Sequence, residues 1–219
     1  MKKSQVLWLV GLGSVVVFAV TPVKCQGNAA AQPRSGVAAM SPAEQDTILG
    51  NHIVRTMEVV RSPLSSVERQ LTAQLLVGVA NSFFEDLDSK RDWIRVLAIE
   101  SKFMQEAKSP VGATGIGQVM PQYATEFGKL CGIKGATAKD LENILVNAAI
   151  SACVWRHMIE IAPDHSVILA LAAYNSGPSS SSTKGIQHGG SAVAETANYI
   201  SKFAYLKEVT SKPTQMDRK

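Results

Sequence analysis

Helix-start signals, each followed by apolar residues at helical spacing, recur along this chain and limit its fold more than any other feature. Ser41-Pro42-Ala43-Glu44 combines an N-cap serine, a proline at the first helical position and a capping-box glutamate. Thr137-Ala138-Lys139-Asp140 has the same capping-box pattern. Runs of strand-forming residues bounded by hairpin dipeptides are absent from the sequence. We therefore predict a mainly α fold.

Caps and breakers divide the chain into a series of predicted helices. The segment that carries Glu100 is predicted to be helical from Arg91 to about Met104. The serine-rich segment 179–190 is predicted to be a mobile loop, because its composition offers little to a core. The other predicted helices are 41–60, 65–87, 121–132, 137–162, 166–176 and 195–209.

Composition fits one globular domain with appendages. The chain has 219 residues, of which 46% are hydrophobic and 18% charged. The formal net charge of +4 falls to +1 without Lys2, Lys3 and Lys24, which flank the N-terminal apolar stretch. No basic stripe interleaved with aromatic residues remains, so nucleic-acid binding is not expected.

The N-terminus has the pattern of an export signal. Lys2 and Lys3 precede an apolar run at residues 6–20, and small residues beyond it provide a cleavage site after Ala31. An uncleaved inner-membrane anchor formed by residues 6–23 is the alternative, since the run is nearly long enough to span a bilayer. Lys24 before Cys25 disfavours a lipoprotein. Either way, we expect the body to be exported to the periplasm or cell envelope.

Export bears on the two cysteines of the body. An oxidising compartment permits Cys131 and Cys153 to form a disulfide. The alternative is that both are small buried hydrophobic residues.

Glu100 is the most informative single residue. It lies four residues after Val96 and three before Phe103, on the apolar stripe of its helix. Burial against apolar side chains would raise its pKa and keep the carboxyl protonated, as a general acid requires. The alternative is that Glu100 lies at the end of the stripe and turns out to water.

The segment that follows contains no acid from Ala107 to Thr125. Its glycines, including Gly115 and Gly117, let the backbone approach a ligand, and Gln118 provides an amide suited to sugar hydroxyls. The spacing G-x-x-G-x-G, without a preceding strand or a following Gly-Lys-Ser/Thr, excludes a nucleotide site. Scattered histidines without H-E-x-x-H or C-x-x-C predict no metal site, and no cofactor is expected.

Four short motifs in order resemble the soluble-lytic-transglycosylase family, which has a goose-lysozyme-like fold. They are Glu100-Ser101, Gly115-Ile116-Gly117-Gln118-Val119-Met120-Pro121, Ala173-Tyr174-Asn175-Ser176-Gly177-Pro178 and Glu195-Thr196-Ala197-Asn198-Tyr199-Ile200. The resemblance is strongest to short exported members that accompany secretion, conjugation or pilus machines. It implies a single lysozyme-like helical domain at residues 65–207. A signal or anchor (1–31), a linker with an N-terminal helix (32–64) and a polar tail (208–219) would complete the chain.

The resemblance also implies an activity on peptidoglycan glycan strands. Such enzymes cleave the β-1,4 bond between N-acetylmuramic acid and N-acetylglucosamine, and one glutamate protonates the leaving oxygen and then deprotonates the sugar's C6 hydroxyl. Glu100 would be that acid and base. Substrate contacts would come from Ser101, Gln118, Met120, Tyr174, Asn175, Glu195 and Tyr199.

Two departures from the family pattern and two rival functions remain open. Gly117 stands where many members carry methionine, which would loosen one side of the glycan groove, and segment 179–190 is serine-rich where relatives often have apolar or aromatic residues. The rival functions are a hydrolase of the goose-lysozyme type and a low-turnover peptidoglycan-binding adaptor of a secretion or pilus system.

Overall fold

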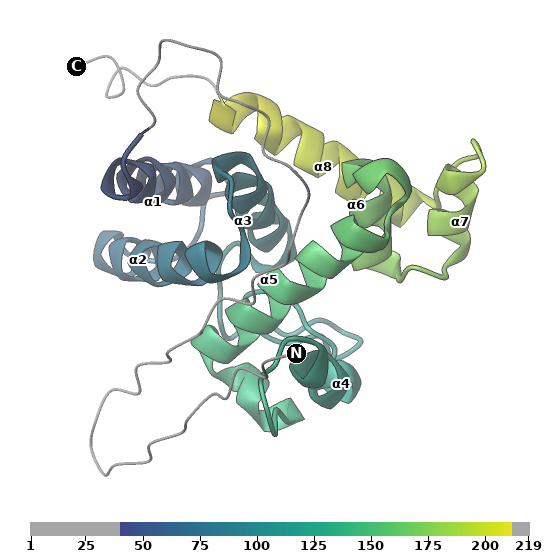
Figure 1. The fold of residues 1–219 in the computed structure, drawn as a ribbon, viewed down its shortest axis with the longest axis horizontal. Coiled ribbons are helices and arrows are strands. Elements are labelled where there is room, and N and C mark those ends of the chain that lie inside the picture. Colours follow the sequence, from purple (N-terminus) through teal and green to yellow (C-terminus); the bar gives the residue numbers. More distant parts are fainter. Residues whose placement is uncertain (1–39, 212–219) are drawn as a thin grey trace, which may run out of the picture.

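The computed structural model describes residues 40–211, and the predicted signal or anchor at residues 1–31 lies outside them. The mainly α prediction is confirmed, because within this range helices dominate and no strand forms (Figure 1). The α-helices are α1 Pro42–Val59, α2 Ser66–Phe83, α3 Leu87–Ser101, α4 Ala124–Leu130, α5 Ile144–Ile161, α6 Val167–Ser176, α7 Ser181–Gln187 and α8 Ala194–Ser211. Short 3₁₀ helices are η1 Pro121–Tyr123, η2 Ala138–Glu142 and η3 Pro163–His165.

Helix α1 belongs to the core. Its predicted capping box forms, with the Ser41 hydroxyl accepting from the Glu44 N–H and the Glu44 carboxylate accepting from the Ser41 N–H. Its buried face, Leu49, Ile53 and Met57, is completely inaccessible to solvent. Because α1 packs on α2, α3 and α8, it lies inside the domain rather than in a linker before it (Figure 1).

Helix α3, which carries Glu100, is shifted from its predicted position. It begins at Leu87, where the Asp86 carboxylate caps the Ser89 N–H, and not at Arg91. It ends at Ser101 instead of Met104, because Lys102 and Phe103 have left-handed backbones with φ of 53° and 68°. Glu100 therefore lies at the very end of the helix.

Helix α5 lies at the centre of the molecule and contacts α2, α4 and α6 (Figure 1). The predicted capping box at Thr137 forms, but it starts only η2. The main helix begins again at Ile144, because the Asn143 side chain caps the Leu145 and Val146 N–H groups. Among the described residues α5 is long and apolar enough to cross a membrane, yet here its apolar residues pack in the core.

The prediction that residues 179–190 form a loop without a role in the core was wrong, because they contain α7. Ser180 caps this helix by accepting from the Thr183 N–H, and Thr183 donates to the Gly177 carbonyl. The buried Ser182 hydroxyl accepts from the Val193 N–H. Hydrogen bonds of the serine and threonine hydroxyls thus hold this segment where apolar packing is scarce. The composition of the segment did not reveal these bonds.

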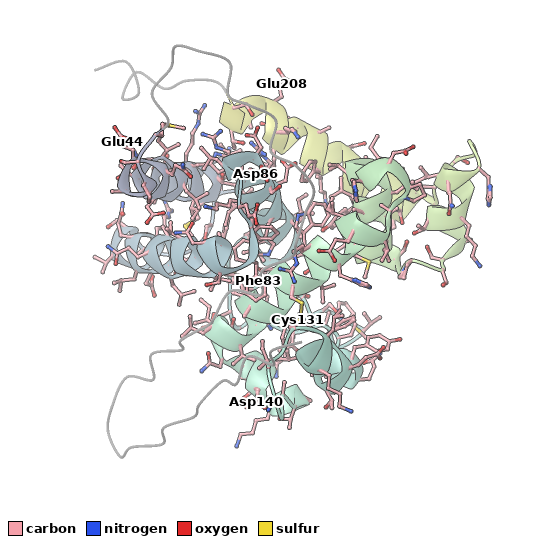
Figure 2. The ribbon with its side chains drawn as sticks, in the orientation of Figure 1. Glu44, Phe83, Asp86, Cys131, Asp140 and Glu208 are labelled. Carbon is pink, nitrogen blue, oxygen red and sulfur yellow. A yellow bond between two sulfur atoms is a disulfide. The ribbon has the colours of Figure 1, made fainter. Side chains whose placement is uncertain are left out.

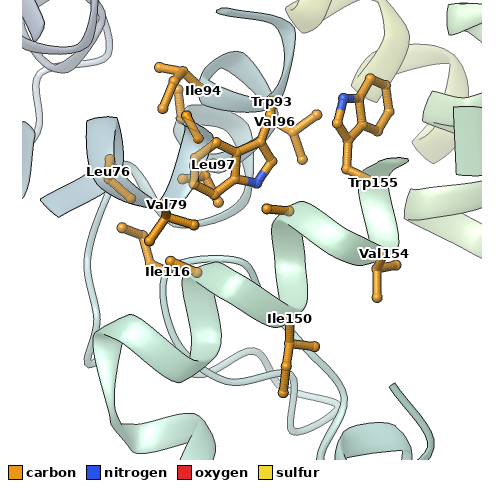
Figure 3. Close-up of a cluster of buried hydrophobic side chains, with 14 of the residues drawn as sticks. Leu76, Val79, Trp93, Ile94, Val96, Leu97, Ile116, Ile150, Val154 and Trp155 are labelled. Carbon is orange, nitrogen blue, oxygen red and sulfur yellow. The ribbon is translucent and has the colours of Figure 1, made fainter. Parts of the chain in front are cut away.

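The core lies between α1, α2, α3, α5 and α6. Trp93 and Leu97 of α3 lie toward Leu76 and Val79 of α2, and Val96 lies on the side of Trp155 of α5 (Figure 3). Ile116, from the loop between α3 and η1, is fully buried in the same cluster. Burial of this side chain anchors the glycine-containing loop next to the end of α3.

Candidate active site

The carboxyl group of Glu100 is held near the end of α3, next to the point where the chain turns out of the helix. The residue is partly buried, and loss of hydration raises its pKa from 4.5 to about 7. This agrees with the expectation of a carboxyl kept partly protonated at neutral pH. Such a group can donate a proton and take one back with little change of free energy.

Tyr199 of α8 makes the hydrogen bond that fixes this carboxyl. Its hydroxyl donates to Glu100 Oε1 over 2.7 Å, and within residues 40–211 no other hydrogen bond reaches the carboxyl of Glu100. This bond, and the positive charge of Lys202 one turn later on α8, favour the carboxylate and partly offset the rise of its pKa. Tyr199 therefore orients the carboxyl and moderates its acidity.

A loop of residues 114–119 lies beside Glu100. Thr114 and Val119 exchange two backbone hydrogen bonds, of 3.0 and 3.1 Å, which close the loop. The Ser101 hydroxyl, next to Glu100 in sequence, donates to the Ile116 carbonyl over 2.8 Å. The structure thus uses Ser101 to join the end of α3 to the loop.

Gln118 has a structural contact that the sequence did not indicate. Its backbone is left-handed, with φ of 48°, and its side-chain amide donates to the carbonyls of Ala107 (3.1 Å) and Gly115 (2.9 Å). The amide N–H groups therefore support the loop, and the side-chain carbonyl remains for a ligand.

Tyr174 and Asn175, at the end of α6, connect this region to its neighbours. The Tyr174 hydroxyl donates to the Gly117 carbonyl over 2.9 Å, and the Asn175 side-chain oxygen accepts from the Thr196 hydroxyl of α8 over 3.0 Å. Burial and the nearby Glu100 charge raise the pKa of Tyr174, so its hydroxyl stays protonated. The loop, α6 and α8 are thereby joined around Glu100.

Two of the predicted substrate contacts, Glu195 and Met120, are not joined by hydrogen bonds to Glu100 or to the two site tyrosines in the described residues. Glu195 is exposed in the first turn of α8, a position that the helix dipole favours for an acid. Met120 is partly buried just before η1.

The sequence reasoning missed two polar residues of α5, Asn147 and Ser151, which are both fully buried. The Asn147 side chain accepts from the Gly117 N–H and donates to the carbonyls of Thr114 and Leu141, at 2.8–3.0 Å. Ser151 is hydrogen-bonded to Tyr174 over 2.9 Å. Their spacing of four residues in the otherwise apolar stretch 144–155 was the signal available.

Gly117 packs closely against α5. A Cβ atom at this position would meet the side chains of Ser151 and Asn147. The expectation that Gly117 loosens a glycan groove stays a prediction.

The two cysteines of the body lie together. Cys131, at the end of α4, and Cys153 of α5 are joined in a disulfide with a Cα–Cα distance of 5.7 Å (Figure 2). The bond ties α4 to the helix that also carries Asn147 and Ser151.

Other kinds of site find little support in residues 40–211. They contain no group of three or more His, Cys, Asp or Glu side chains placed to hold a metal ion. A hollow lined by Phe84, Asp92, Trp155 and His165, among others, includes none of the predicted site residues.

Comparisons with known proteins find one family model and two solved structures that are similar to this chain. Residues 89–195 match the family model described as the Transglycosylase SLT domain. The fold is similar to the 70 kDa soluble lytic transglycosylase SLT70 from Escherichia coli, with a TM-score of 0.53 and 20% identity over 82% of this chain and 33% of that one. A second similar structure, an inactive mutant of the lytic transglycosylase Slt from Pseudomonas aeruginosa, has a TM-score of 0.45 and 19% identity over 81% of this chain and 38% of that one.

The chain spans about a third of the length of these solved proteins. No curated protein sequence matches it significantly.

Proposed function

We propose that the protein is a peptidoglycan lytic transglycosylase, because residues 89–195 match the family model of the transglycosylase SLT domain. It would cleave the β-1,4 bond between N-acetylmuramic acid and N-acetylglucosamine and form a 1,6-anhydro sugar. The observation that carries the proposal is Glu100, a carboxyl with a pKa of about 7 that is oriented by the Tyr199 hydroxyl.

In the first step protonated Glu100 gives its proton to the glycosidic oxygen, and the bond from that oxygen to C1 of the muramic acid breaks. In the second step the C6 hydroxyl oxygen of the same sugar bonds to C1, and the Glu100 carboxylate takes its proton. The carboxyl is protonated again at the end, and no water is consumed. A pKa near 7 suits a group that acts as acid and then as base.

The surroundings of Glu100 favour this reaction over hydrolysis. Glycosidases generally place two carboxylates about 5–10 Å apart, one on each side of the scissile bond. In the described part of the chain the pKa of Glu100 is shifted by burial, Tyr199 and Lys202 and by no other carboxyl group, and residues 107–125 contain no acid. An internal hydroxyl of the substrate then replaces the water that a second acid would activate.

The proposed substrate-binding residues come from the end of α3, loop 114–119 and the residue after it, the end of α6, and α8. Gln118 offers its side-chain carbonyl, and Tyr174 and Asn175 lie where α6 meets the loop and α8. Ser101 shapes the loop, and Met120, Glu195 and Tyr199 complete the set. Export of the enzyme to the periplasm or envelope, supported by the N-terminal apolar pattern, would bring it to its substrate.

We further propose that the enzyme opens the wall locally for an envelope-spanning machine. Support comes from the resemblance of its four motifs to exported transglycosylases that accompany such machines. Deletion of the gene should reduce assembly of such a machine, and restoring the Glu100→Gln protein should not repair it. Full repair by that variant would contradict the proposed role.

The test of the activity is digestion of peptidoglycan sacculi followed by mass analysis of the products. Wild-type protein should release anhydro-muropeptides, and Glu100→Gln should lower the rate by at least about 100-fold, since general acid–base catalysis contributes at least that much. Glu106→Gln is the control. Glu106 is an exposed glutamate shortly after Glu100 in the sequence, and this variant should keep full activity.

Products that are one water heavier would identify a hydrolase. Undiminished release by Glu100→Gln would exclude Glu100 as the acid. Binding to sacculi without turnover by the wild-type protein would identify an adaptor.

A further inference from the structure

Both backbone polar groups of Gly117 are held by side chains from other helices. Its N–H donates to Asn147 Oδ1 of α5 over 2.9 Å, and its carbonyl accepts from the Tyr174 hydroxyl of α6 over 2.9 Å. The next residue back, Ile116, accepts from Ser101 beside Glu100. Residues 116 and 117 thus connect α5 and α6 to the end of α3.

The side of Gly117 that faces α5 is filled by Ser151. A Cβ atom at position 117 would lie 2.6 Å from Ser151 Oγ and 3.3 Å from Asn147 Oδ1, and still closer to Ser151 Cβ. Gly117 does not have a positive φ, so lack of space, and not backbone conformation, demands glycine here. The Ser151 side chain and any side chain at 117 exclude each other.

Ser151 is also the centre of a directed hydrogen-bond chain. The Trp93 indole N–H donates to Ser151 Oγ over 3.1 Å. The Tyr174 hydroxyl donates its proton to the Gly117 carbonyl. In the hydrogen bond between Ser151 and Tyr174 the Ser151 hydroxyl must therefore be the donor and the Tyr174 oxygen the acceptor. The chain runs from Trp93 through Ser151 and Tyr174 to Gly117, and its first two members are fully buried.

We propose that Ser151, together with Asn147, is a positioning residue for the reaction at Glu100. It fixes the Tyr174 hydroxyl and occupies the space beside Gly117, so that loop 114–119 keeps one position against the end of α3. This rests on the proposed transglycosylase activity. Packed cores do not deform continuously, so a small displacement at Ser151 reaches the substrate-facing side of the loop.

The test is a double-mutant cycle in the full-length protein, with turnover measured on glycan strands of defined length. Gly117→Ala should lower kcat about tenfold or more, because the new Cβ collides with Ser151. In a Ser151→Gly background the same Gly117→Ala change should cost less than about twofold. Equal costs in the two backgrounds would overturn the proposal.

Ser151→Ala separates positioning from stability. It should lower kcat about tenfold with KM changed less than twofold, at a temperature where the variant is fully folded. Thr56→Ala, which removes a buried hydroxyl from α1, is the matched control and should lower the melting temperature without changing kcat. Equal kcat values for Ser151→Ala and wild type would refute the proposed role.

A nuclear magnetic resonance spectrum gives a result that does not depend on activity. Ser151→Ala should shift the Trp93 indole N–H signal and leave that of Trp155 in place.

If wild-type protein forms no anhydro product, the proposed function fails. If it does and the cycle shows no coupling, only the inference about Ser151 fails.

Discussion

At the scale of single residues, the balance of forces on Glu100 decides what the site can do. Burial favours the neutral carboxyl, whereas the Tyr199 hydroxyl and the Lys202 charge favour the carboxylate. The resulting pKa of about 7 places both protonation states within reach at neutral pH. Each of these groups can therefore be tested by its effect on the pH profile.

Tyr199→Phe should lower kcat by about 10- to 100-fold, the equivalent of one hydrogen bond to a charged group. Because the lost bond had favoured the carboxylate, the pKa of Glu100 should rise. The fall of kcat/KM on the alkaline side, expected near pH 7 in wild type, should then move to higher pH. Tyr205→Phe, exposed on the same helix, is the control. A move to lower pH would contradict the assignment.

Glu100→Gln should stabilise the fold at high pH. With a pKa of 4.5 in the unfolded chain and about 7 in the folded one, the folded state binds more protons between these values, so wild-type stability falls as pH rises from about 4.5 to about 7. Urea denaturation should show the variant ~1–3 kcal/mol more stable at pH 8, and no more stable than wild type at pH 4. The same advantage at both pH values would show that Glu100 carries no such penalty.

At the scale of helices, the site depends on how α8 lies on α3, because these two helices supply Tyr199 and Glu100. Arg95 of α3 is buried, and burial lowers its pKa. It donates to Asp92 over 2.6 Å and to the Thr210 hydroxyl of α8 over 3.1 Å. Lys207 of α8 binds the other oxygen of Asp92 over 3.2 Å. This network fixes the far end of α8.

Asp92→Asn should lower the free energy of unfolding by about 3 kcal/mol, because it leaves the buried Arg95 charge without its partner. Lys207→Met is the matched control, and it should cost less than about 1 kcal/mol, since Lys207 is half exposed. Both values come from chemical denaturation. Similar losses for the two variants would mean that the buried pair with Arg95 is not the dominant contact.

At the scale of the whole molecule, the domain is larger than the motifs suggested. The order of the four motifs pointed to residues 65–207, but α1 contributes Leu49, Ile53 and Met57 to the core, and α8 continues to Ser211 with Thr210 buried. The disulfide between Cys131 and Cys153 adds a further long-range connection.

A chain that begins at residue 65 should therefore fail to fold, whereas one that begins at residue 40 should fold fully. Each lost core side chain of α1 removes ~2–5 kcal/mol, and three together exceed the stability of an ordinary domain. Circular dichroism and a melting curve test this. A cooperative melt of the shorter chain, close to that of the longer one, would show that α1 is dispensable.

Local signals in the sequence determined which segments are helical. The capping boxes at Ser41 and Thr137 form because a hydroxyl and a carboxylate three residues apart can satisfy free N–H groups without help from the rest of the chain. The apolar stripe around Glu100 likewise indicated a buried carboxyl. The end of α3, at the left-handed Lys102, was missed because no glycine or proline announces it.

The tertiary structure alone decided how the site is assembled. Tyr199 lies 99 residues from Glu100, and Ser151 lies 34 positions after Gly117, so neither contact follows from local spacing. Packing of α5, α6 and α8 around the loop brings them together, because burial of apolar surface fixes the helices and the polar groups must then find partners within that arrangement. The sequence indicated Glu100 as the candidate acid, and the packing of distant helices determined the groups that orient its carboxyl.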